Sequence, residues 1–142
     1  MIDAIIQQLA AHCATLKTVE GAFDLASLMD AQFAVAPGKR PAAFVMLANE
    51  DASPNEIDLG GVAQLVKQTV QIAFCVGGGE TAGKAVAKDA VMSVRDAVMA
   101  TLLGWSPDDQ GVLVYGGLRM LAFRPRTVWF EMTFARDAGV ST

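Results

Sequence analysis

The sequence predicts a single α+β domain, residues 1–142, in which a mainly antiparallel or mixed β-sheet packs against two main α-helices. Two segments carry apolar residues at three- and four-residue spacing, which is typical of amphipathic helices. Other runs alternate apolar and polar residues, as half-buried strands do, and the links between consecutive strands are short. Short links favour antiparallel pairing, because parallel strands need long crossover connections. A chain of this length fits one hydrophobic core.

The first predicted element is an amphipathic helix over residues 2–16. Its apolar stripe consists of Ile2, Ile5, Ile6, Leu9, Cys13 and Leu16. His12 lies beside this stripe, so we expect it to be partly buried. Residues 17–30 then predict a short extended piece, a turn at glycine, and a helical turn that begins at Asp24.

The central part of the chain predicts two strands separated by a loop. Residues 42–48, AAFVMLA, are apolar without interruption, which indicates a strand buried on both faces. Residues 49–61 are acidic and rich in turn formers, which indicates an exposed loop. From Val66 to Val76 the residues alternate, which predicts a long strand.

The remaining chain predicts a second helix and three strands. The helix covers residues 85–103, and Gly104 ends it. The strands cover residues 112–115, 118–123 and 128–135, with glycine pairs or RPR between them. In the last strand one face is expected to carry Val128, Phe130, Met132 and Phe134, and the other Trp129, Glu131 and Thr133.

The stretch GGGETAGK between the long strand and the second helix resembles a phosphate-binding loop. Gly78, Gly83 and Lys84 satisfy most of the G-x-x-x-x-G-K-[ST] signature. The next residue is Ala85, so the hydroxyl that would bind Mg²⁺ is missing. No second parallel strand ending in aspartate completes a metal site. A flexible connection is therefore the favoured interpretation, and a small nucleotide-binding protein remains the alternative from a different functional class.

Composition excludes several further classes. The net charge of −4 disfavours general nucleic-acid binding, which needs a basic surface. No apolar run reaches the length of a membrane span, and the amino terminus does not resemble a signal peptide. Cys13 and Cys75 are expected to be buried thiols, because nothing indicates an oxidising compartment. With one histidine and no recognisable nucleophile–base pair, we expect no enzyme activity, metal or cofactor.

An ordered set of residues resembles the tail terminator family of long-tailed phages and prophages. In LLGWSPDDQGVLVYGGLRMLAF and TVWFEMTFA, the matching residues are Leu102, Leu103, Gly104, Trp105, Pro107, Tyr115, Gly116, Gly117, Arg119, Leu121 and Trp129. Upstream, VEGAFDLASL and PAAFVM are also similar to that family. The resemblance covers about residues 17 to 136.

The resemblance implies a structural protein that forms a homo-hexameric ring on the head-proximal end of the tail tube. The ring would stop tube polymerisation and offer a surface to the neck proteins. The implied partners are further copies of the chain, the tube protein and the neck proteins, and the implied locations are the host cytoplasm and then the virion tail. Another neck component, such as a head-closure or connector protein, is the nearer alternative.

The candidate interface residues are charged residues in loops and near strand ends, since loops commonly order on docking. They are Lys39, Arg40, Glu50, Asp51, Glu56, Asp58, Glu80, Lys84 and Arg119. No catalytic, cofactor-binding or metal-binding residue is proposed.

Overall fold

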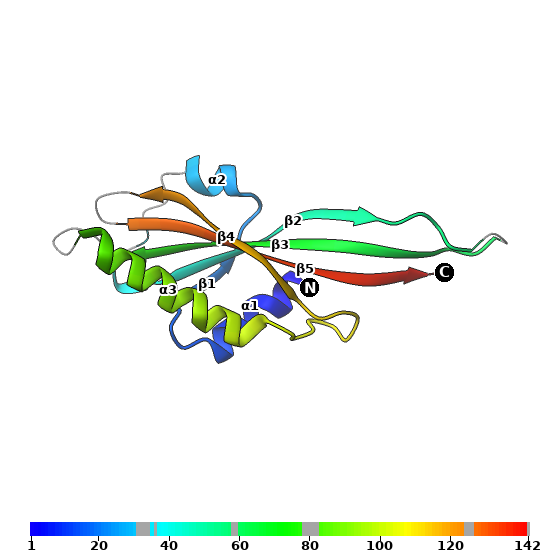
Figure 1. Ribbon diagram of the computed structural model, residues 1–142, viewed down its shortest axis with the longest axis horizontal. Coiled ribbons are helices and arrows are strands. Elements are labelled where there is room, and N and C mark those ends of the chain that lie inside the picture. The colour runs from blue at the N-terminus through cyan, green and yellow to red at the C-terminus, as the bar shows by residue number, and fades with distance from the viewer. Residues whose placement is uncertain (31–34, 36, 58–59, 78–82, 124–126, 142) are drawn as a thin grey trace.

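A five-stranded sheet with helices on both faces forms the domain, which confirms the α+β class (Figure 1). The computed structural model describes residues 1–30, 35, 37–57, 60–77, 83–123 and 127–141. The described elements follow in the order α1 (Ile2–His12), β1 (Thr18–Gly21), α2 (Leu25–Asp30), η1 (Pro37–Lys39), β2 (Ala42–Ala52), β3 (Ala63–Gly77), α3 (Gly83–Leu102), β4 (Val114–Phe123) and β5 (Thr127–Ser141).

The strand order across the sheet is β1-β2-β3-β5-β4. β1 pairs with β2 in parallel, and every other neighbouring pair is antiparallel. β3 and β5 are the central pair and keep one continuous register from Ala63 opposite Ser141 to Gly77 opposite Thr127. β1 and β4 therefore form the two edges of the sheet.

Two hydrophobic clusters lie on opposite faces of this sheet. The first cluster joins α1 and α3 to alternate residues of the central strands, among them Phe74 and Phe130, whose rings stack 4.9 Å apart. The second cluster lies under α2 and contains Phe44 and Trp129, 5.8 Å apart. The expected division of β5, with Phe134 on one face and Trp129 on the other, is confirmed.

The two thiols lie in different clusters, Cys13 in the first and Cys75 in the second. Both are free and buried, as expected from the sequence. Burial raises the pKa of the Cys75 thiol to about 11, although the nearby Arg40 guanidinium acts in the opposite direction. Cys75 is therefore a protonated and unreactive thiol at neutral pH.

The first helix is shorter than the sequence predicts. α1 ends at His12 rather than at residue 16, and Cys13 leaves the helical conformation with φ −110° and ψ 83°. Leu16 still belongs to the core, because it is buried in the first cluster although it lies beyond the helix. His12 is exposed, so the expectation of partial burial was wrong.

β2 continues to Ala52, four residues beyond the predicted strand. Residues 49–52 are polar or small and were expected in a loop, but they pair with residues 66–69 of β3. A register shift between Leu47 and Asn49 accompanies this extension. Backbone pairing with β3 therefore outweighs the local turn preference, while the expected exposure of these residues is confirmed.

The carboxyl-terminal part contains two long strands instead of three short ones. Gly116 and Gly117 do not interrupt β4 but lie at a register shift, where Gly117 adopts a φ of +148°. A β-bulge of this kind absorbs an extra residue without ending the strand. β5 runs to Ser141, well beyond the predicted end at residue 135.

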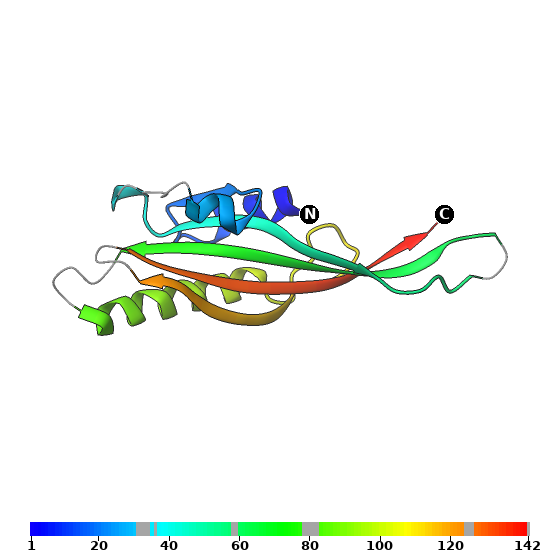
Figure 2. The ribbon, with the colours of Figure 1, turned by 90° about the horizontal axis from the view of Figure 1, so that it is seen from above.

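One end of the sheet projects beyond the helices as a three-stranded arm (Figures 1 and 2). The arm consists of residues 49–52 of β2, 63–69 of β3 and 135–141 of β5. Arg40 and η1 precede β2 at the opposite end of that strand. The molecule therefore has one end covered by helices and one end formed by strands alone.

A close backbone approach fixes the segment between α3 and β4 against β5. A β-carbon on Gly111 would overlap with the carbonyl oxygen of Asp137. The same segment is held by the Gly104 amide, which donates to the Leu113 carbonyl at 2.9 Å. Only glycine fits at position 111 without moving one of the two backbones.

Gly111→Ala is therefore expected to lower the free energy of unfolding by about 1 to 3 kcal/mol, the usual cost of overpacking a tight site. Gly139→Ala is the matched control, because Gly139 lies on β5 two residues from Asp137 and nothing lies within 4 Å of the β-carbon that the change adds. Urea unfolding of both variants measures the difference. Equal midpoints for the two variants would show that the contact between Gly111 and β5 does not exist in solution.

Candidate functional site

A chain of polar contacts crosses the base of the arm on the face that carries α1 and α3. Gln68 donates from Nε2 to Glu50 Oε1 at 2.9 Å, and Arg136 donates from Nε to Gln68 Oε1 at 2.9 Å. The Arg136 guanidinium also bonds both carboxylate oxygens of Asp108, with Nη2 to Oδ2 at 2.7 Å. These four residues, here called the polar ladder, join three strands to the segment before β4.

Arg136 is the buried member of the polar ladder, since only 4% of its surface is exposed. Asp108 retains 37% of its side-chain surface in contact with solvent. The hydrogen bonds from Arg136 lower the pKa of the Asp108 carboxyl below its ordinary value. The pair therefore remains charged at neutral pH and holds the segment before β4 against the arm.

A second buried charge lies on the opposite face of the sheet. Glu131 on β5 forms an ion pair with Arg119 Nη2 at 2.7 Å and accepts a hydrogen bond from Gln71 Nε2. The Glu131 carboxylate is buried, whereas Arg119 on the edge strand remains largely exposed. The ion pair thus orients an exposed cation at the edge of the sheet.

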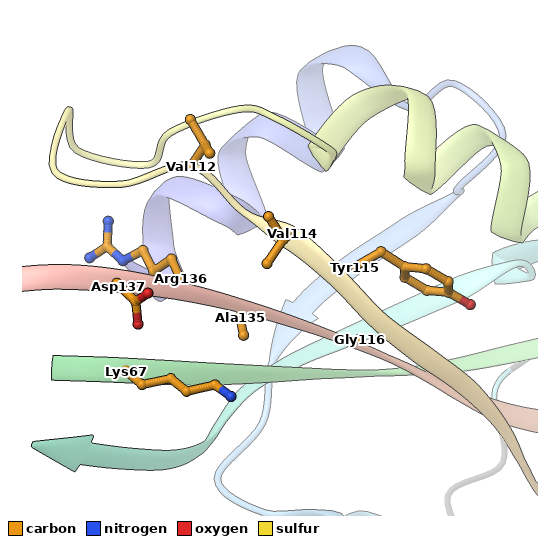
Figure 3. Close-up of a pocket in the computed structure, with 8 residues that line it drawn as sticks. All are labelled: Lys67, Val112, Val114, Tyr115, Gly116, Ala135, Arg136 and Asp137. Atoms are coloured by element: carbon orange, nitrogen blue, oxygen red, sulfur yellow. The ribbon is translucent and has the colours of Figure 1, made fainter.

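An open hollow of about 520 Å³ lies at the β4 edge (Figure 3). It is lined by Lys67, Val112, Val114, Tyr115, Gly116, Ala135, Arg136 and Asp137. Val112 and Val114 are each about half exposed, which is unusual for valines in a strand and its approach. The hollow combines apolar side chains with the charged residues Lys67, Arg136 and Asp137.

The predicted interface residues lie in three separate places. Lys39 is exposed in η1, and the neighbouring Arg40 is half buried and donates from Nε to the Val35 carbonyl at 2.9 Å. Glu50 and Asp51 are exposed on the arm, with Glu56 in the loop that follows it. These residues do not converge on one site.

Arg119 occupies the third place, on the edge strand β4. Asp58 and Glu80 lie outside the described residues, as does the side chain of Lys84, whose backbone belongs to the first turn of α3. Residues 78–82 of the phosphate-loop-like stretch also lie outside them.

The described part of the chain contains neither a metal-binding cluster nor a membrane-spanning helix. Over the described part of the chain, no group of three or more histidine, cysteine or acidic residues could hold a metal ion. Among the helices described here, none combines the length and apolar character that crossing a bilayer requires.

Comparison with known protein families shows to which family this chain belongs. A family model described as "Phage tail terminator protein" matches residues 2–139. The chain belongs to the phage tail terminator family. Comparison with curated proteins gives no significant match. Membership supports a structural role in the phage tail, because the terminator family is a family of structural proteins.

Several features of this tail terminator were not anticipated from the sequence. Arg136 could have been found, since the alternation of β5 places it on the same face as Phe134 and a charge on a core face needs a partner. The partner Asp108 lies in a turn-rich segment and has no periodicity to locate it. The hollow and the exposed Phe23 also depend on tertiary packing that sequence patterns do not encode.

Proposed function

We propose that six copies of this chain form a closed ring that caps the head-proximal end of the tail tube. The ring stops tube polymerisation and provides the surface on which the neck proteins join the head. The observation that carries this proposal is the family match over residues 2–139. The structural role of the family is thereby extended to a specific assembly and a specific position in the tail.

The two edges of the sheet support a ring in which two different surfaces of neighbouring subunits meet. β1 and β4 lie at opposite edges, and among the described strands each has a neighbour on one side only. Open edges tend to associate with further chains unless they are covered. A contact between two different edges repeats from copy to copy and can close into a ring.

The charged residues at the two ends of β2 are proposed to meet different partners. Lys39 and Arg40 precede β2, whereas Glu50 and Asp51 lie on the arm at its other end. Glu50 is held by Gln68, so its carboxylate is presented in a fixed position. We expect one end of the subunit to face the tube and the other to face the neck.

The test adds purified protein to polymerising tube subunits of the same phage or prophage and measures tube lengths by electron microscopy. We expect shorter tubes with ring-shaped density at one end, whereas an unrelated acidic protein at the same concentration should change nothing. Unchanged lengths with bare tube ends would contradict the proposal. Binding to the head portal without any effect on tubes would instead identify a neck component.

A further inference from the structure

Phe23 is the most exposed large apolar side chain among the described residues, with 91% of its surface in contact with solvent. It lies in the link between β1 and α2. A single exposed apolar residue is common on protein surfaces and by itself indicates nothing. Phe23 becomes informative because the same chain carries an apolar hollow at its other edge.

The backbone on both sides of Phe23 is held in place. The amide of Ala22 donates to the Val45 carbonyl at 3.0 Å, and Ala22 packs against the second cluster. On the other side, the Leu28 amide donates to the Asp24 carbonyl at 3.3 Å. The phenyl ring is thus presented by a fixed link, which lowers the ordering cost of inserting it into a partner.

The hollow at the β4 edge has the size and chemistry to accept an aromatic side chain. Its volume of about 520 Å³ exceeds that of one phenyl ring, and Val112, Val114 and Ala135 provide apolar surface. Lys67, Arg136 and Asp137 contribute charged groups to the same lining. Interface pockets that receive an aromatic anchor commonly combine apolar surface with polar groups.

We propose that Phe23 of one copy fills the hollow at the β4 edge of the next copy. This inference rests on the ring proposed above and identifies its subunit contact. A chain cannot fill its own hollow, because β1 and β4 lie at opposite edges of the sheet. The contact therefore joins unlike surfaces and repeats around a ring.

Phe23 and the hollow both lie toward the face of the sheet that carries the second cluster, which agrees with this arrangement. Alternation along β5 places Ala135 and Asp137 on the same face as Trp129, which belongs to the second cluster. Ala22, next to Phe23, packs against that cluster too. Neighbouring copies can therefore lie side by side with the same face of the sheet turned the same way.

Disulfide trapping between single-cysteine additions tests the contact even when it is short-lived. Phe23→Cys protein is mixed with Val114→Cys protein under mild oxidation, with a mass tag on one of the two. Val140→Cys replaces Val114→Cys in the control mixture, because both valines are about half exposed, at 53% and 48%. The native thiols Cys13 and Cys75 are buried and remain unmodified.

We expect the Phe23→Cys and Val114→Cys mixture to give at least a fivefold higher yield of the mixed dimer than the control mixture. Equal yields would overturn the proposed contact. A variant with both changes should give a ladder of covalent oligomers, since each copy can link to two neighbours. A ladder that stops at dimers would mean that the contact joins like surfaces, which also overturns it.

Two variants, Phe23→Asp and Phe23→Leu, distinguish a failure of this subunit contact from a failure of the proposed ring function. The aspartate variant should lose tube capping, while the leucine variant should retain it, because leucine also fills an apolar hollow. Capping by the aspartate variant at the wild-type level would refute the contact and leave the ring intact. Efficient trapping by a wild-type chain that never shortens tubes would refute the ring function and leave the contact intact.

Discussion

Replacing Phe134 with alanine is expected to lower the free energy of unfolding by about 3 to 5 kcal/mol, the cost of emptying a large buried site. Phe134 is fully buried in the first cluster, opposite Val70 on β3 and Tyr115 on β4. The Tyr115 ring lies 5.8 Å away and would lose its neighbour. The melting temperature should fall by about 10 °C or more for a domain of this size.

Phe23→Ala is the control, because it removes the same side chain from an exposed position. In dilute solution, where copies are not associated, it should change the melting temperature by no more than about 2 °C, as surface substitutions usually do. Calorimetry of both variants provides the comparison. If Phe134→Ala and Phe23→Ala have the same melting temperature, the assignment of Phe134 to the buried face of β5 is wrong.

Removing the partner of a buried guanidinium should give the second large effect. Asp108→Ala leaves Arg136 with its hydrogen bond to Gln68 on the polar ladder. We expect a loss of about 2 to 4 kcal/mol, somewhat less than for a fully enclosed pair because water reaches Asp108. Asp96→Ala is the control, since its pair with Arg95 is a surface ion pair worth about 1 kcal/mol or less.

The pH dependence of stability provides an independent measurement of the same pair. The pKa of Asp108 is lowered in the folded state, so its contribution is fully present above the unfolded pKa, about 3.9. That contribution disappears as the pH falls through the lowered folded pKa. The stability difference between wild type and Asp108→Ala should therefore be constant near neutrality and narrow below about pH 4. A difference that stays constant down to pH 2 would exclude the ion pair.

The fold class and the facing of the core strands could be predicted from the sequence. In the core parts of β3 and β5 one face carries large apolar side chains at every second residue, whereas the other face mixes polar and apolar ones. The positions at which the strands end could not be predicted in this way. Residues 49–52 have polar side chains typical of a loop, but β3 provides the pairing that extends β2. Gly116 and Gly117 have the composition of a turn, and only the pairing with β5 shows that they form a bulge.

The candidate site was less accessible to prediction than the core. Charge and loop position pointed to Glu50 and Arg119, yet each is held by a partner distant in the sequence, Gln68 and Glu131 respectively. Phe23 lies within VEGAFDL, which mixes apolar and acidic residues, and nothing there distinguishes an exposed ring from a core residue. Contacts of this kind depend on the meeting of remote segments, so they appear only once the sheet is assembled.

The position of β3 at the centre of the sheet has a consequence for the order of folding. Its pairing with β2 needs only a hairpin, whereas its pairing with β5 joins Gly77 to Thr127 at one end and Ala63 to Ser141 at the other. Closing such long loops is entropically costly and slow. During synthesis, β3 leaves the ribosome long before β5, so one side of β3 lacks its strand partner until β5 has been made. The nascent chain is therefore expected to be prone to association until residues 127–141 have been translated.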